Sequence, residues 1–322
     1  MPRSTPPSAR RPSLSSGSRS PDVDPRWLLK ALVLTLLFAL LCGYASLCVL
    51  FYQGQWQFVL HPVTSTSAQP PVAAASAEFV RFAPNESAVP QLTGWWIPAA
   101  PGATHAQATI LYLPSGDESV AASSTLLTAL HGIGINVFAF DYRGYGQSIP
   151  THPSQRNMTQ DSESAWRYLH AFRDIADDKI VPYGVGVGTS LATHLAVSHP
   201  ASLGVILESP RADLLETVRH DRRVRILPVR LLFHDDFPLA ATLSILHTSK
   251  LLLSVGEAPP VFQEAADPKI TVEFRPALGP FYTQSAFSEA VSRFLDQSLP
   301  PPPPPRLVLT PRTTPAPPRS AK

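Results

Sequence analysis

Residues 183–192 read YGVGVGTSLA, which is the composition of a strained strand-turn-helix that can present a catalytic nucleophile. In the G-x-S-x-G form of this turn the central serine attacks the substrate, and glycines flank it because the tight turn leaves no room for a Cβ atom. Here the central position is Gly186, which has no side chain. The spacing therefore predicts a nucleophile turn without a nucleophile.

Strands and helices alternate on both sides of this turn. We expect strands at 79–82, 92–97, 109–113, 136–140, 180–183, 204–207, 251–255 and 270–274, and helices at 122–130, 160–172, 191–198 and 281–295. This alternation predicts one α/β domain over residues 78–298, with a mainly parallel twisted sheet flanked by helices. The first two strands have no helix between them, which suits an antiparallel edge. Residues 211–247 break the rhythm, and we expect a cap or an irregular excursion there.

Three motifs identify the kind of domain. They are G-W-W-I-P at 94–98, D-Y-R-G-Y-G-Q-S at 141–148 and E-S-P at 208–210, of which the second is the most specific. Together with an apolar run near the N-terminus, they make residues 50–298 resemble the membrane-anchored α/β-hydrolases of the serine-hydrolase, peptidase and depalmitoylase-like group. The resemblance implies an eight-stranded α/β-hydrolase sheet and, in active members, a Ser, Asp, His triad in that chain order.

The resemblance also assigns a place to each member of the triad. The serine falls on Gly186, the acid of a G-x-x-D pattern falls on Pro259, and the histidine of a G-H pair falls on Pro280. All ten histidines lie at or before His247, so none is left for the segment that precedes the last helix. The resemblance therefore implies a degenerate triad, with nucleophile, acid and base all lost. Deleting a whole triad costs a factor of roughly 10⁶ in turnover in the well-studied case of subtilisin.

Two further positions bear on residual activity. The turn that should carry an oxyanion donor reads P-S-G at 114–116, and a proline offers no amide hydrogen. The backbone N–H of Val187 is expected to supply the second donor. Ser190 lies one helical turn beyond Gly186, where it could act as a displaced nucleophile, although a small residue there also favours close helix packing.

Residues 31–52 form an uncharged, leucine-rich run, and about 20 apolar residues suffice to cross a bilayer. Basic residues precede the run and no charged residue follows it until Glu78, which predicts a single-pass membrane anchor with a cytosolic N-terminus and an extracytoplasmic main domain. A cleaved signal peptide is the alternative, but its apolar region is usually only about 7–15 residues long. Both cysteines, Cys42 and Cys48, fall inside the run, so the outer domain has no disulfide.

The remaining segments are predicted from composition. Residues 1–30 form a disordered basic tail, residues 53–77 a connector, and residues 299–322 a Pro-rich disordered tail of extended polyproline character. Between the tails the chain holds 16 basic and 22 acidic residues, which argues against a nucleic-acid partner. We find no metal-binding spacing and no phosphate-binding glycine loop, and we therefore expect neither a metal nor a cofactor.

These observations lead to one leading hypothesis and two alternatives. The leading hypothesis is a membrane-anchored, catalytically degenerate α/β-hydrolase-fold protein that binds a partner protein or a small acyl- or ester-like ligand in the old cleft. The first alternative is an active esterase, lipase or peptidase-like serine hydrolase with Ser190 as its displaced nucleophile. The second is a tethered scaffold whose working part is the proline tail.

Overall fold

The structure is a computed structural model that describes residues 24–65, 70–73, 76–83, 89–276 and 279–299 of the 322-residue chain. It divides into two compact units, residues 1–51 and residues 52–322, and each is described by itself. Most of the two tails predicted at 1–30 and 299–322 lies outside the described residues.

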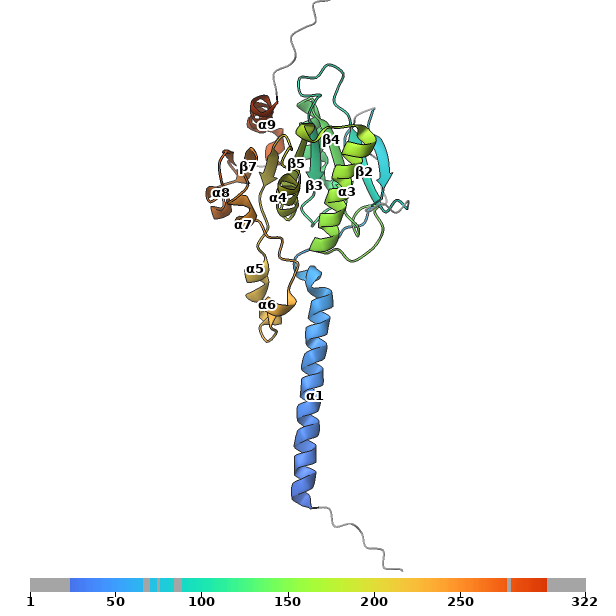
Figure 1. The fold of residues 1–322 in the computed structure, drawn as a ribbon, viewed down its shortest axis with the longest axis vertical. Coiled ribbons are helices and arrows are strands. Elements are labelled where there is room, and N and C mark those ends of the chain that lie inside the picture. Colours follow the sequence, from blue (N-terminus) through green and yellow to red (C-terminus); the bar gives the residue numbers. More distant parts are fainter. Residues whose placement is uncertain (1–23, 66–69, 74–75, 84–88, 277–278, 300–322) are drawn as a thin grey trace, which may run out of the picture. The chain divides into compact units, whose positions relative to one another are not determined.

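One long helix, α1 (Pro25–Gly54), contains the apolar run (Figure 1, blue). It is long and apolar enough to cross a membrane. The helix begins six residues before the predicted run 31–52 and ends two residues after it. The early start has a local cause, because the Asp24 carboxylate accepts a hydrogen bond from the Arg26 N–H at 2.9 Å and caps the first turn.

Residues 78–274 supply a mixed sheet of eight strands. In spatial order they are β1 (Glu78–Phe82), β2 (Leu92–Ile97), β4 (Asn136–Asp141), β3 (Thr109–Leu113), β5 (Ile180–Val185), β6 (Val205–Glu208), β7 (Lys250–Val255) and β8 (Lys269–Phe274). The pairs β1–β2 and β2–β4 are antiparallel, and every other neighbouring pair is parallel. Both the antiparallel edge and the parallel body were predicted from the sequence, and the sheet confirms them.

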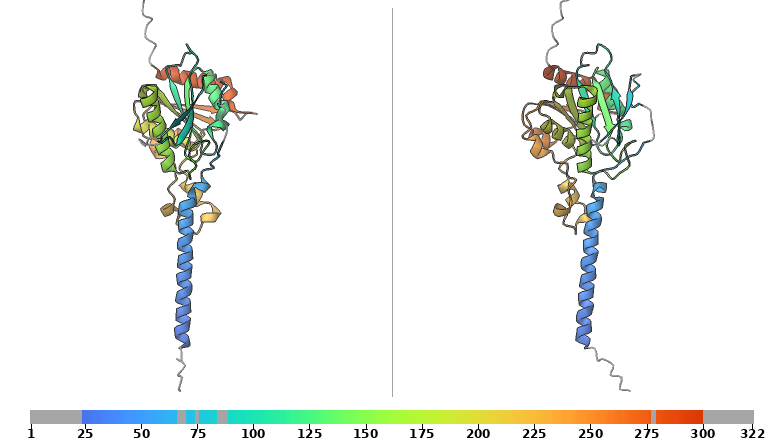
Figure 2. Two further views of the ribbon diagram at one scale, coloured as in Figure 1. Left: turned by 90° about the vertical axis from the view of Figure 1, so that its right-hand side faces the viewer. Right: turned by 45° about the vertical axis from the view of Figure 1, so that its right-hand side comes forward.

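Helices cover both faces of this sheet, as Figure 2 shows. On one face, α2 (Ser124–Gly132) and α9 (Ser285–Ser298) pack their apolar side chains against the strands in one continuous core. On the other face, α3 (Gln155–Arg173) and α4 (Gly188–Ser198) lie beside each other. A short 3₁₀ turn precedes both α2 and α9: η2 (Val120–Ser123) leads into α2, and η5 (Phe281–Thr283) leads into α9.

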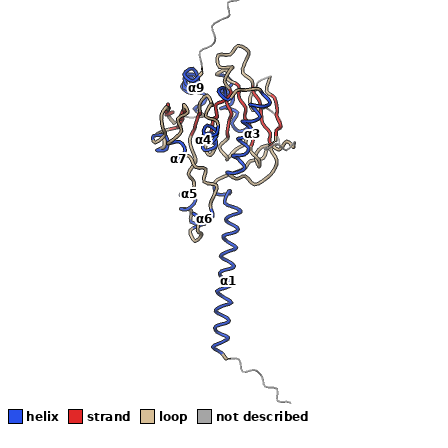
Figure 3. Tube along the Cα trace, in the orientation of Figure 1, coloured by secondary structure: helices blue, strands red, loops and turns tan. Residues whose placement is uncertain are grey.

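The excursion predicted at 211–247 is mostly loop with short helical turns (Figure 3). It contains α5 (Leu215–Arg219), η4 (Arg222–Val224), α6 (Val229–Leu232) and α7 (Ala240–Leu243). The remaining short elements are η1 (Gln55–Phe58), η3 (Asp177–Lys179) and α8 (Pro260–Gln263).

Most predicted elements are present, but several are longer than predicted. The largest difference is at α3, which begins five residues before the predicted residue 160. Its start is fixed by Ser154, whose hydroxyl oxygen accepts a hydrogen bond from the Asn157 N–H at 3.2 Å. The helix ends where Asp174 adopts a left-handed backbone conformation with φ of 54°. Polar caps of this kind lie outside the apolar period, so the period alone underestimates a helix.

Candidate functional site

The strand-turn-helix predicted around Gly186 is present between β5 and α4. Gly186 has a φ of +57°, in the left-handed region that favours glycine. A Cβ atom at Gly184 would lie 2.2 Å from the Gly188 carbonyl oxygen, so this turn also excludes larger residues before its centre. The turn therefore has the geometry of a nucleophile elbow at the carboxyl end of β5, and its centre is a bare backbone.

The loop after β3 lies directly over this turn. A Cβ atom built on Gly186 would lie 3.0 Å from the Cβ atom of Ser115. The N–H of Val187, predicted as the remaining oxyanion donor, points to the Ser115 carbonyl oxygen at 3.4 Å. The loop after β3 thus offers a backbone acceptor to the Val187 N–H and borders the position that a side chain on Gly186 would take.

The connector closes the same region from outside. The N–H of His61 donates to the Gly116 carbonyl at 3.0 Å, and the Tyr145 hydroxyl donates to the same oxygen at 2.7 Å. Leu60 is 1% exposed and packs against Gly116. The Arg211 guanidinium donates to the Val59 carbonyl at 2.7 Å and so fixes the connector to the loop that follows β6. Segments far apart in sequence therefore pack against the loop that lies over the elbow.

The predicted acid and base positions lie at the same edge of the sheet. Pro259 follows β7 and caps α8, and Pro280 follows β8 and caps η5. Because β5, β7 and β8 run parallel, their carboxyl ends share one edge with Gly186. Neither proline carries a group that can exchange a proton. The three positions that the resemblance assigned to a triad therefore share one edge of the sheet, and none of them carries a nucleophilic, acidic or basic side chain.

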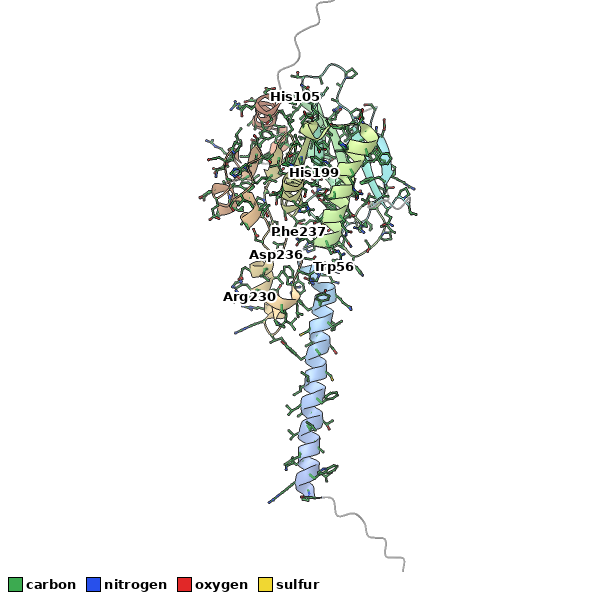
Figure 4. All side chains as sticks on the ribbon, viewed as in Figure 1. Trp56, His105, His199, Arg230, Asp236 and Phe237 are labelled. Atoms are coloured by element: carbon green, nitrogen blue, oxygen red, sulfur yellow. The ribbon has the colours of Figure 1, made fainter. Side chains whose placement is uncertain are left out.

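Ser190, the candidate displaced nucleophile, is buried and hydrogen-bonded to the backbone. It is 6% exposed, and its hydroxyl donates to the Pro238 carbonyl at 2.8 Å. His194, four residues further along α4, pairs instead with Glu163, with 3.4 Å between its Nε2 atom and the carboxylate. His199, which is labelled in Figure 4, reaches the same carboxylate at 3.0 Å and stacks on Trp166. These two histidines hold α4 to α3, and the serine hydroxyl has a backbone acceptor.

A buried carboxyl group that the sequence did not single out for chemistry lies at this edge. Glu208 ends β6, is 3% exposed, and accepts hydrogen bonds from the hydroxyls of Tyr183 and Tyr282 at 2.5 Å each. Burial raises the pKa of Glu208 to about 7, although the two hydroxyls act in the opposite direction. Tyr282 comes two residues after Pro280. The segment that the resemblance expects to carry the histidine therefore places a tyrosine hydroxyl on Glu208.

The sequence offered a weak signal for this cluster. Glu208 ends an otherwise apolar strand, V-I-L-E, and a charged residue at the end of a buried strand requires partners. Those partners come from β5 and from η5, which are distant along the chain. Both carboxyl oxygens are satisfied by tyrosines, so the cluster holds the sheet edge to the segment before α9.

An open groove lies beside Tyr282, with a volume of about 580 Å³. It is lined by small apolar side chains and hydroxyl groups from the connector, α2 and η5: Pro71, Ala73, Ser124, Thr125, Thr128, Ala129, Tyr282 and Thr283. Pockets of about 300–1,000 Å³ with apolar walls are typical of small-molecule sites. In the part of the chain that the structure describes, no cluster of three or more His, Cys, Asp or Glu side chains could hold a metal ion.

Comparison with known proteins agrees with this fold. The family described as serine aminopeptidase, S33, matches residues 104–250. An uncharacterised protein of Mycobacterium tuberculosis is 31% identical over 189 residues, covering 56% of this chain and 64% of that protein. Alpha/beta hydrolase domain-containing protein 17C of Xenopus tropicalis is 35% identical over 91 residues, covering 28% of this chain and 29% of that protein. The chain therefore spans less than two thirds of the length of these curated relatives.

Among solved structures, an esterase of Pyrococcus furiosus superimposes with a TM-score of 0.56 at 18% sequence identity. The superposition covers 74% of this chain and 99% of the esterase. At that identity the likeness establishes the shared fold, and it carries no statement about activity.

Proposed function

Since this chain belongs to the α/β-hydrolase superfamily, we propose that it is a catalytically degenerate member that acts by binding rather than by hydrolysis. In this proposal α1 anchors the chain in a membrane, with the N-terminus cytosolic and the α/β domain on the opposite side. The basic residues before the apolar run and the uncharged segment after it support that orientation.

The observation that carries the proposal is the contact of Ser115 with the elbow. Its carbonyl oxygen faces the Val187 N–H, and its Cβ atom lies where a side chain on Gly186 would project. An ester substrate needs both a nucleophile and a donor for its oxyanion at this place. Here the nucleophile is missing, because residue 186 is glycine, and the Val187 N–H already has the Ser115 carbonyl as its acceptor. We therefore expect no ester hydrolysis at this turn.

The groove beside Tyr282 is the proposed binding site, and a small acyl- or ester-like molecule is the proposed ligand. Its volume of about 580 Å³ falls in the range of small-molecule sites, and its walls combine methyl groups with hydroxyls that suit an alkyl chain next to a carbonyl. The groove adjoins the segment before α9, from which an active relative would supply its histidine. The proposed ligand is thus of the same chemical class as an ester substrate, but it is bound and not hydrolysed.

Ester hydrolysis tests the catalytic half of this proposal. We expect the full-length protein, its Ser190→Ala variant and its Gly186→Ser variant to hydrolyse p-nitrophenyl acetate and p-nitrophenyl butyrate no faster than buffer. The serine placed at 186 has no histidine or acid to activate it, because Pro259 and Pro280 occupy those positions. Turnover by the wild type that is lost in Ser190→Ala would establish the displaced-nucleophile alternative.

Binding tests the other half. We expect a fluorescent fatty-acid probe to bind the full-length protein, and Thr128→Trp to weaken that binding at least about tenfold because the indole would fill the groove. Thr271→Trp is the matched control, since Thr271 is an exposed threonine on β8 that does not line the groove. Equal binding by both variants would contradict the assignment of the groove.

A further inference from the structure

A strongly basic segment, residues 216–231, projects from the domain as part of the excursion after β6. We call it the cationic cap. It holds five arginines and only two acidic residues, and it consists of most of α5, all of η4 and the first part of α6. Leu231 is 82% exposed and Ile226 is 68% exposed. Arginines and large exposed aliphatic side chains thus share one short segment.

The acidic residues of the cap do not balance its arginines. Glu216 pairs with both Arg219, at 3.0 Å, and Arg230, at 3.5 Å. The second carboxylate, Asp221, is paired with Arg223 at 2.6 Å. Two other arginines, Arg222 and Arg225, form no ion pair with any residue that the structure describes. The cap therefore presents surplus positive charge to its surroundings.

A hollow of about 480 Å³ opens on the cap between α5 and α6. Its rim carries Arg219, His220, Arg225 and Arg230, and its apolar floor includes Leu227 and Val229. Figure 4 shows Arg230 on α6, and Asp236 and Phe237 on the loop between α6 and α7. A phosphate group with attached hydrocarbon matches this combination, because guanidinium groups bind phosphate oxygens through paired hydrogen bonds.

The cap and the residues just after it contact the end of the apolar run and the residues that follow the run. The Gln55 side-chain oxygen accepts a hydrogen bond from the His234 N–H at 2.7 Å, and the His234 ring lies 4.9 Å from the ring of Tyr52. The Arg223 guanidinium stacks over the ring of Phe58 at 4.5 Å. The position of the cap along the chain is therefore tied to the point at which the apolar run ends.

We infer that the cationic cap docks on the headgroup layer of the membrane, with its arginines on the phosphates of anionic phospholipids. The inference rests on the proposed anchoring by the apolar run: if residues 31–52 cross the bilayer, residues 52–58 leave it, and the cap attached to them reaches the headgroups. Basic residues are attracted to anionic lipid within about 10 Å, the Debye length at moderate salt. With the proposed orientation, the docking requires anionic phospholipid in the leaflet on the side of the α/β domain, opposite to the cytosolic N-terminus. Leu231 and Ile226 then enter the boundary between headgroups and acyl chains.

A fluorophore at residue 231 tests this docking in the full-length protein. The native cysteines are replaced (Cys42→Ser, Cys48→Ser), Leu231→Cys carries the label, and the protein is reconstituted into phosphatidylcholine vesicles with or without phosphatidylserine. A nitroxide-labelled lipid serves as the quencher. We expect at least about a twofold loss of fluorescence in the phosphatidylserine vesicles, because side chains in this layer lie ~5–10 Å deep.

Two controls isolate the cap. Phe172→Cys is the matched label position, since Phe172 is 79% exposed. The start of α3 at Gln155 contacts Asp235, near the cap. Phe172 lies 17 residues further along α3, which is about 25 Å. The second control compares two triple variants of equal charge change. Arg222→Gln, Arg225→Gln and Arg230→Gln should abolish the quenching at residue 231, whereas Arg81→Gln, Arg275→Gln and Arg293→Gln should leave it unchanged.

Flotation of the same vesicles after an alkaline wash reports anchoring separately. Quenching at residue 231 together with flotation would support both proposals. Flotation with no more quenching at residue 231 than at residue 172 would overturn the docking and leave the anchor. Quenching that is lost with the protein during the wash would overturn the anchor and leave the docking. Quenching that is equal without phosphatidylserine would contradict the role of anionic headgroups.

Discussion

Two loops at the carboxyl edge of the sheet differ in how they use their side chains. The loop after β4 carries the D-Y-R-G-Y-G-Q-S motif of residues 141–148, and its polar groups have partners within the domain. The Asp141 carboxylate accepts from the Val120 N–H at 2.8 Å, and the Ser148 hydroxyl donates to the Asp141 carbonyl at 2.6 Å. The loop after β5 has Gly186 at its centre and contributes only backbone.

The difference separates two properties that a family motif can carry. The motif most specific to the resemblance works as scaffolding, since Arg143 binds buried Asp161 and the Tyr145 hydroxyl binds the backbone over the elbow. The turn where the resemblance places the nucleophile has the backbone of an elbow and a glycine at its centre. A strong match to a family therefore shows that the fold is shared, and the reacting positions must be examined one by one.

The largest effect is expected from the scaffolding loop. Arg143→Ala leaves Asp161, whose side chain is fully buried, without its guanidinium partner at 2.7 Å. We expect the free energy of unfolding, from urea unfolding of the full-length protein in detergent micelles, to fall by about 3–5 kcal/mol. Arg219→Ala, which breaks the exposed pair with Glu216, is the control and should change stability little. Similar losses in both variants would refute the scaffolding role of the loop.

The next effect concerns the buried Glu208. Its folded-state pKa of about 7 exceeds the usual value, so the folded protein holds this proton more tightly than the unfolded chain. The stability from the protonated carboxyl is complete below the unfolded pKa and is lost as the pH rises through 7. The free energy of unfolding of wild type minus that of Glu208→Gln should therefore fall by on the order of 3 kcal/mol between pH 4.5 and pH 8.

Urea unfolding of both proteins across that pH range measures the difference. Burial also raises the pKa values of Asp141 and Asp161 to about 6, but both proteins share these groups and their effects cancel in the difference. A difference that does not vary with pH would mean that Glu208 titrates like an exposed carboxyl.

A smaller effect is expected when a side chain is restored to the elbow. Gly186→Ser places a Cβ atom at a φ of +57° and 3.0 Å from the Cβ atom of Ser115. Gly256→Ser is the matched control, because Gly256 has a φ of +81° with open space around it. Both should lose about 1–2 kcal/mol from the backbone conformation, and Gly186→Ser about 1 kcal/mol more from the contact. Equal losses in the free energy of unfolding would show that the loop carrying Ser115 moves aside at no cost in stability.

The smallest effect is expected at the displaced-nucleophile position. Ser190→Ala removes one buried hydrogen bond to the Pro238 carbonyl and should cost about 0.5–1.5 kcal/mol. Ser244→Ala removes an exposed bond of the same kind, to the Ala241 carbonyl, and should cost less. Thermal unfolding by circular dichroism compares the two variants. A gain in stability for Ser190→Ala would suggest that Ser190 is held under strain, as reactive groups often are.

The sequence predicted the sheet well because its signals are local. Strands 92–97 and 109–113 have the bounds that their apolar residues indicated, and the glycines around Gly186 indicated the turn. The missed features all depend on contacts between distant segments. The Ser115 carbonyl over the elbow, the tyrosines on Glu208 and the cap against residues 52–58 join parts of the chain that share no periodic pattern. Such contacts become visible only when the fold has brought the segments together.

Fluorophosphonate labelling distinguishes a binding protein from an active serine hydrolase. The full-length protein in detergent micelles is treated with the probe, and modified residues are mapped by mass spectrometry, with heat-denatured protein as the background. We expect no labelling above background at any serine, including Ser115 and Ser190, because Gly186, Pro259 and Pro280 stand at the positions of the nucleophile, acid and base. Specific labelling of Ser190 that is abolished by Ser190→Ala would contradict the proposed loss of catalysis and make this chain an enzyme with a relocated nucleophile.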